Sequence, residues 1–90
     1  MEYAVKGNVR GRVEGVGFRA FVKQLAQENN VIGWAKNLDD GSVEVVLKGE
    51  RNTVNLVQHM IASGPQAAEV RSLNWALLAE AADIEGFSIH

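Results

Sequence analysis

Hydrophobic residues recur along the chain with two different periods, one typical of strands and one typical of helices. Tyr3, Val5 and Val9 alternate with other residues, and so do Val43, Val45 and Leu47, which predicts a half-buried strand in each place. Together with three further segments, the expected strands are residues 3–10, 31–37, 42–48, 67–78 and 86–89. The orientation of 67–78 stays open, because Val70 and Trp75 differ in parity and cannot share one face of a regular strand.

Two helices are expected, at residues 18–29 and 51–62. The first has a single apolar stripe at spacings of three and four residues, formed by Phe18, Phe21, Val22, Leu25 and Ala26. The second has the stripe Val54, Val57, Met60 and Ile61. It ends at Ser63-Gly64-Pro65, a normal terminator. His59 shares the polar side of this helix with Asn52 and Asn55, so we expect a solvated histidine.

The order of these elements is strand, helix, strand, strand, helix, strand, followed by a connection at 79–85 and a short last strand. Two split βαβ units of this kind form a ferredoxin-like sandwich. We therefore predict an α+β fold with an antiparallel sheet, two helices on one face and a short fifth strand. Ninety residues fit one domain, so we expect residues 1–90 to form a single domain.

A glycine-rich segment at residues 11–17 joins the first strand to the first helix. In a split βαβ unit the first two strands run parallel with one strand between them, so their carboxyl ends lie roughly 10 Å apart. This segment, the start of the first helix and Asn37 should therefore meet at one edge of the sheet. Helix N-termini and glycine-rich turns present N–H groups to anions. Arg19 would add a guanidinium fork suited to phosphate.

From these residues alone, interpretations without any anion site also stay open. Most glycine-rich turns bind nothing. Arg19 could be a surface arginine, although a cation in the first helical turn opposes the helix dipole. Asn37 could belong to the hairpin turn that Asp39-Asp40-Gly41 predicts. Residues 15–20 also match the loose dinucleotide pattern G-x-G-x-x-A, but that fold needs more strands than this chain can build.

The composition of the chain excludes several classes of partner and site. Nine Lys and Arg against eleven Asp and Glu give a net charge of −2, which argues against a nucleic-acid partner. Five of the cations, Lys6, Arg10, Arg12, Arg19 and Lys23, fall in the first quarter, a pattern that suits a small anion. With no cysteine and only His59 and His90, we expect no metal site. No apolar run approaches the roughly 20 residues of a membrane span, and we expect a cytoplasmic protein.

Two segments closely resemble the signatures of the acylphosphatase family. They are residues 11–19, GRVEGVGFR, and residues 33–44, GWAKNLDDGSVE, and similarity continues at 63–65 and 86–89. The resemblance implies the same ferredoxin-like fold and hydrolysis of acyl phosphates without metal or organic cofactor. It implies that Arg19 and the loop Glu14, Gly15, Val16, Gly17 and Phe18 bind the substrate phosphate, and that Asn37 orients the attacking water. Inorganic phosphate or sulfate would bind as product or inhibitor, and we expect a monomer.

The chain departs from the family pattern in two places. Glu14 stands where glutamine is usual, and a carboxylate beside phosphate is unfavourable unless Arg10 or Arg12 pairs with it or it points outward. The end, Ser88-Ile89-His90, replaces an arginine and an aromatic residue, so we expect a looser last strand and a mobile His90.

Hydrolysis of an acyl phosphate needs few catalytic residues. An acyl phosphate leaves as a carboxylate, whose conjugate acid has a pKa near ~4, so no general acid is required. Positioning and charge stabilisation are what phosphoryl transfer mainly demands. The alternative function is a non-catalytic ferredoxin-like module that binds small anions. An RNA-binding module would carry aromatic residues on its central strands, and 42–48 has none. A domain serving a larger acyl-phosphate enzyme is a third possibility.

Overall fold

The structure, a computed structural model, describes residues 2–79 and 83–90. The predicted order of elements is confirmed. In chain order they are β1 (Glu2–Arg12), α1 (Phe18–Glu28), β2 (Ile32–Asn37), β3 (Val43–Glu50), α2 (Arg51–Ser63), β4 (Glu69–Leu77) and β5 (Phe87–Ile89). Residues 80–82 of the predicted connection lie outside the described residues.

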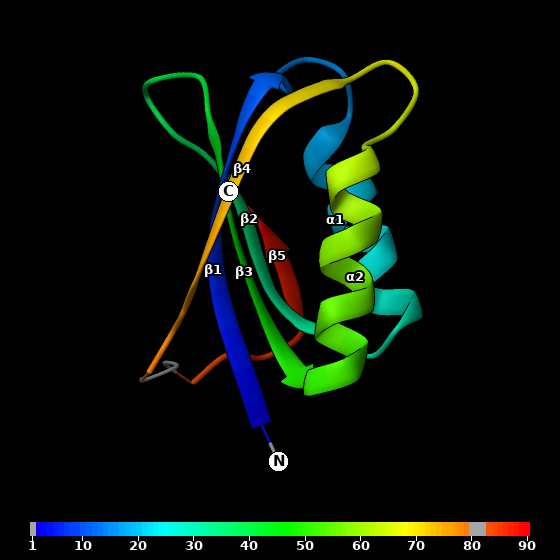
Figure 1. The fold of residues 1–90 in the computed structure, drawn as a ribbon, viewed down its shortest axis with the longest axis vertical. Helices are drawn as coiled ribbons and strands as arrows, with labels where there is room; N and C mark the ends of the chain where they lie inside the picture. The colour runs from blue at the N-terminus through cyan, green and yellow to red at the C-terminus, as the bar shows by residue number, and fades with distance from the viewer. Residues whose placement is uncertain (1, 80–82) are drawn as a thin grey trace.

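The strands form one sheet in the order β4-β1-β3-β2-β5, with α1 and α2 on the same face (Figure 1). The pairs β1–β3, β1–β4 and β2–β3 are antiparallel, as predicted. The prediction of a wholly antiparallel sheet is wrong at one edge, because β5 pairs with β2 in parallel. Gly33 lies beside Phe87 and Ala35 beside Ile89, so the two strands run in the same direction. The sheet is therefore mixed.

The core fills the space between the sheet and the helices. Val22 and Ala26 of α1, and Val57 and Ile61 of α2, are fully buried against the strands, as the apolar stripes predict. The second helix begins with a side-chain cap, since the carboxylate of Glu50 accepts from the amides of two residues in the first turn, both at 3.2 Å. No helix of the described chain is long and apolar enough to cross a membrane.

A β-bulge explains the mixed parity of β4. Arg10 pairs with Ser72 and Gly11 with Val70, so Arg71 is an extra residue in β4. One extra residue shifts every later side chain to the other face. Val70 before the bulge and Trp75 beyond it therefore both pack against the core.

The same bulge corrects the boundary of the first strand. Strand β1 continues to Arg12, two residues beyond the predicted end, and Gly11 belongs to the strand and not to the loop. Gly11 has φ +133°, and a Cβ there would collide with the backbone oxygen of Glu69. Glycine is thus needed because the β4 backbone approaches closely. The segment between β1 and α1 is only residues 13–17, called the glycine loop below.

Candidate active site

The glycine loop leads directly into the N-terminus of α1. Gly15 and Gly17 have φ +70° and +74°, a left-handed conformation that other residues rarely adopt. The first bond between the loop and the helix is donated by the Phe21 amide to the Gly17 carbonyl, at 3.0 Å. The amides of residues 18–20 precede that bond and have no intrahelical acceptor. The loop therefore directs backbone donors and the positive end of the helix dipole to one place.

Buried side chains hold the loop at both ends. Val13, at its start, and Phe18, the first helical residue, are each almost fully buried, and Val16 between them packs partly against the core. Glu14, Gly15 and Gly17 remain exposed. The backbone of the loop is thus fixed by apolar anchors, while its polar part faces outward.

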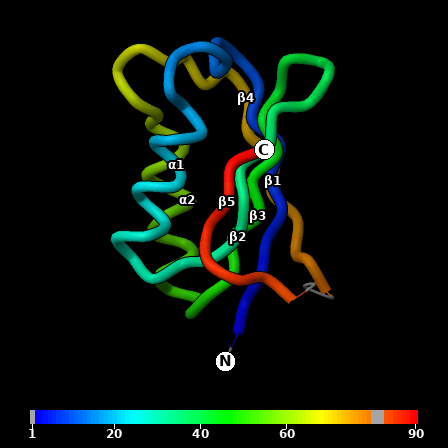
Figure 2. The backbone as a smooth tube through the Cα atoms, turned by 180° about the vertical axis from the view of Figure 1, so that it is seen from behind, coloured from blue at the N-terminus to red at the C-terminus, as the bar shows by residue number. Residues whose placement is uncertain are grey.

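Arg19 and Asn37 meet at one backbone oxygen. The main-chain oxygen of His90 accepts from the Arg19 guanidinium at 2.8 Å and from the backbone N–H of Asn37 at 2.9 Å. The His90 amide in turn donates to the Ala35 carbonyl, at 2.9 Å. Figure 2 shows the end of β5 lying beside the base of the β2–β3 hairpin. The topology therefore brings Arg19 and Asn37 together, as the order of elements predicted.

His90 was not identified as part of this site from the sequence. The expectation of a mobile His90 is wrong, because its backbone is bonded to three residues and its ring contacts the Ser88 hydroxyl at 2.9 Å. Strand β5 also forms despite its unusual residues, pairing Phe87 with Gly33. His90 takes part in the site through its backbone, and backbone groups are the same in every residue, so the sequence gives no sign of this role.

The side chain of Asn37 has an unused acceptor. By strand parity Asn37 lies on the same face of β2 as Gly33 and Ala35, the face that α1 covers. Its Oδ1 is buried and accepts no hydrogen bond from the described residues. Buried polar atoms without a partner are uncommon in folded proteins. This oxygen is therefore an unused acceptor for a small donor such as water.

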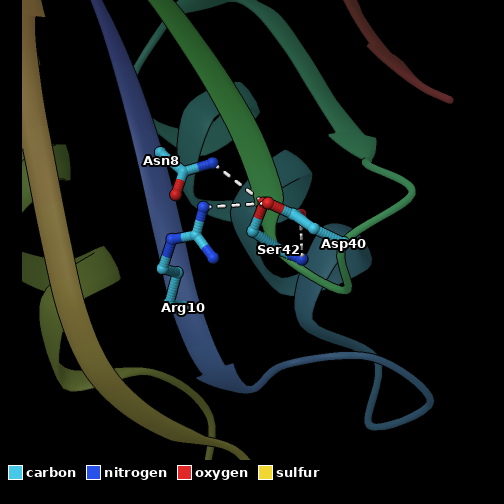
Figure 3. A network of polar contacts seen from close by, with 4 residues as sticks. All are labelled: Asn8, Arg10, Asp40 and Ser42. Carbon is cyan, nitrogen blue, oxygen red and sulfur yellow. Dashed lines mark hydrogen bonds and ion pairs between the residues drawn. The ribbon is translucent and has the colours of Figure 1, made fainter.

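The hairpin after Asn37 is held by a saturated polar network (Figure 3). One oxygen of Asp40 accepts from both the amide and the hydroxyl of Ser42, and the other accepts from Arg10 at 2.8 Å. Asn8 donates to the same hydroxyl, at 2.9 Å. The hydrogen bonds from Ser42, aided by Arg10, lower the pKa of Asp40 from 3.8 to about 2. The expected turn at 39–41 is confirmed, since the Gly41 amide donates to the Leu38 carbonyl at 3.1 Å.

The basic residues of the first quarter do not form one patch. Because side chains alternate along β1, Lys6 and Arg10 share the face that the helices do not cover. There Lys6 lies 3.3 Å from Glu44, and Arg10 pairs with Asp40. The prediction of one basic cluster is therefore wrong, because Lys6 and Arg10 lie on the other face of the sheet and are each next to a carboxylate. Arg19, in contrast, has no Asp or Glu carboxylate within 4 Å among the described residues, and it donates to the main-chain oxygen of His90.

Glu14 is not paired with Arg10 or Arg12 but points outward, the second arrangement expected from the sequence. It is exposed, and no cation lies within 4 Å of its carboxylate in the described part of the chain. Its Oε2 extends toward the hairpin, where it would lie 3.9 Å from a methyl group placed on Gly41. Within residues 2–79 and 83–90, no three His, Asp or Glu side chains come close enough to hold a metal ion.

A model of the acylphosphatase family matches residues 5–89. An acylphosphatase of Oceanobacillus iheyensis is 40% identical over 86 residues, which are 94% of either chain. The crystal structure of an acylphosphatase from Bacillus subtilis superposes with a TM-score of 0.93 at 32% identity, over 100% of this chain and 99% of that one. The structure of an acylphosphatase from Coxiella burnetii superposes with a TM-score of 0.92 at 35% identity, over 99% of this chain and 93% of that one.

Proposed function

Because this chain belongs to the acylphosphatase family and is therefore an enzyme that hydrolyses acyl phosphates, we propose that the glycine loop, Arg19 and Asn37 form its active site. The observation that carries the proposal is the shared His90 oxygen, which fixes Arg19 and Asn37 beside each other. A guanidinium, a set of backbone donors and a buried acceptor then surround one position at the edge of the sheet.

The substrate phosphate binds to the loop and to Arg19. The amides of residues 14–19 supply the donors, and those at the start of α1 have no intrahelical acceptor. Arg19 uses one N–H on the His90 carbonyl, and its other N–H groups remain for phosphate oxygens. The bond to His90 also orients the planar fork before substrate arrives. A preoriented fork stabilises developing charge without reorganisation during the reaction.

Asn37 orients the water that attacks phosphorus. Its buried Oδ1 accepts a hydrogen bond from that water, which leaves a lone pair of the water oxygen directed at the substrate. A new P–O bond forms as the bond from phosphorus to the acyl oxygen breaks, and the acyl group departs as a carboxylate. The proton of the water passes to a phosphate oxygen of the substrate, as the family resemblance implies. The products are a carboxylate and inorganic phosphate.

The test follows loss of the anhydride in benzoyl phosphate, using protein freed of metal and kept in chelator. We expect the wild type to hydrolyse it and Arg19→Ala to lose turnover by about 10³-fold or more, the order found for arginines that stabilise phosphoryl transfer. Arg19→Lys should also fail, because a point charge cannot reproduce the fork. Lys23→Ala, a change of another cation on α1, is the matched control and should remain active.

The outcomes separate the alternatives. Near-normal kinetics in Arg19→Lys would contradict the role of the fork. An equal loss in Lys23→Ala would assign the effect to the net charge of the helix. Wild-type protein that binds inorganic phosphate but leaves benzoyl phosphate intact would instead be a small-anion-binding module.

A further inference from the structure

A hollow of about 380 Å³ opens between the glycine loop and the β2–β3 hairpin. One wall is the end of β1 with the start of the loop, and the other is the tip of the hairpin. Its charged lining residues are Arg10, Arg12, Glu14 and Asp40. Neither Arg19 nor Asn37 lines it, so the hollow is a neighbour of the proposed phosphate position and not the same place.

Both walls continue directly into the proposed active site. Glu14 precedes Gly15 in the loop, and consecutive Cα atoms are about 3.8 Å apart. Asp40 in the opposite wall follows three residues after Asn37 on the hairpin. An acyl group is joined to phosphorus through a single oxygen atom. A phosphate held by the loop therefore carries its acyl group to within a few ångströms of these walls.

The charges in the hollow are not equally compensated. Arg10 and Asp40 neutralise each other at 2.8 Å. Arg12 lies opposite Glu69 of β4, but that carboxylate is paired with Arg71 at 3.0 Å, and the charge of Arg12 only adds to the lowering of the Glu69 pKa. The carboxylate of Glu14 has no cation within 4 Å among the described residues, and it leans across the hollow toward Gly41.

We propose that this hollow receives the acyl group and that Glu14 makes the enzyme prefer acyl phosphates with a neutral or cationic acyl group over those with an anionic one. The inference rests on the proposed function, since it needs phosphate to bind in the loop. In water, a unit charge 4 Å from the carboxylate changes a binding constant by about fivefold relative to an uncharged group at the same place. A cation and an anion should thus be separated by roughly 5- to 30-fold through this one carboxylate.

The test compares three substrates that differ only at the para position of the ring. They are benzoyl phosphate, its 4-carboxy derivative and its 4-trimethylammonium derivative. The readout is the ratio of kcat/KM between the cationic and the anionic substrate, in which any effect on the shared phosphate cancels. We expect this ratio to be about 5- to 30-fold lower in Glu14→Gln than in the wild type. Raising the salt concentration should also lower the wild-type ratio.

Two further variants make the result specific. Glu28→Gln removes the same charge from an exposed site at the far end of α1 and should leave the ratio unchanged. Arg12→Gln removes a lining cation and should raise the ratio. An unchanged ratio in Glu14→Gln, or the same shift in Glu28→Gln, would overturn the inference while leaving the proposed function intact. Wild-type protein that hydrolyses none of the three substrates would overturn both.

Discussion

The β2–β3 hairpin and the glycine loop lie at the same end of the sheet but differ in how their polar groups are satisfied (Figure 1). On the hairpin, the buried hydroxyl of Ser42 has partners on both sides, and each oxygen of Asp40 accepts a hydrogen bond. At the loop, the amides before Phe21 have no intrahelical acceptor. At the end of β2, where the hairpin begins, Oδ1 of Asn37 is buried and has no donor among the described residues.

This difference separates the residues that hold the site from those that act in it. A satisfied network stabilises one conformation of the hairpin and hence the position of Asn37 at its base. A buried polar group without a partner is unfavourable unless a ligand or water completes its hydrogen bonds, and exposed backbone donors are free to exchange solvent for a ligand. Substitutions in the two regions should therefore affect different quantities, stability on the hairpin and turnover at the loop.

After Arg19→Ala, the largest effect should follow Asn37→Ala. Removing one preorganised hydrogen-bonding group lowers kcat by roughly 10²–10³-fold in other enzymes. Inhibition by inorganic phosphate should change little, because the loop and Arg19 remain. Steady-state kinetics with benzoyl phosphate and phosphate as inhibitor measure both quantities, and Asn74→Ala on the exposed part of β4 is the control. An equal loss of phosphate affinity would mean that Asn37 contacts the phosphate itself.

The part of this comparison that could be predicted from sequence follows from topology and turn chemistry. The order of elements placed Asn37, the loop and Arg19 at one edge, and Asp-Gly predicted the turn. The bulge at Arg71 and the His90 carbonyl could not be predicted in this way. Both are main-chain contacts between segments distant in sequence, and the backbone groups involved are the same in every residue. Gly11 was misassigned for this reason, since its close neighbour lies on β4.

A smaller effect, on stability, should follow Ser42→Ala. Ser42 is 1% exposed, and its hydroxyl joins Asn8 to Asp40. Its removal leaves the Asn8 amide without this acceptor, at a cost of about 1–3 kcal/mol in the free energy of unfolding. Urea denaturation measures it, with Ser72→Ala on exposed β4 as control. We expect kcat to stay within a few-fold of wild type, and a loss as large as that of Asn37→Ala would show that the hairpin takes part in turnover.

The smallest effect concerns pH, and it comes from the hairpin carboxylate Asp40. Because its pKa falls from 3.8 to about 2 on folding, the folded protein binds fewer protons than the unfolded chain between these values. The ionised group therefore stabilises the fold above pH 4, and this contribution is lost as the pH falls toward 2. Asp40→Asn removes the titrating group, so its urea midpoint should fall less steeply than that of the wild type over this window.

Asp39→Asn is the matched control for that experiment, since it removes a neighbouring carboxylate that makes none of the hydrogen bonds drawn in Figure 3. Some acid dependence should persist in Asp40→Asn, because the amides of Asn52 and Thr53 also lower the pKa of Glu50. The slope between pH 4 and 2 should therefore decrease without vanishing, and only in the Asp40 variant. Equal slopes in the two variants would mean that the bonds from Ser42 and Arg10 do not favour the charged form, and the hairpin would then owe its conformation to its backbone and not to this network.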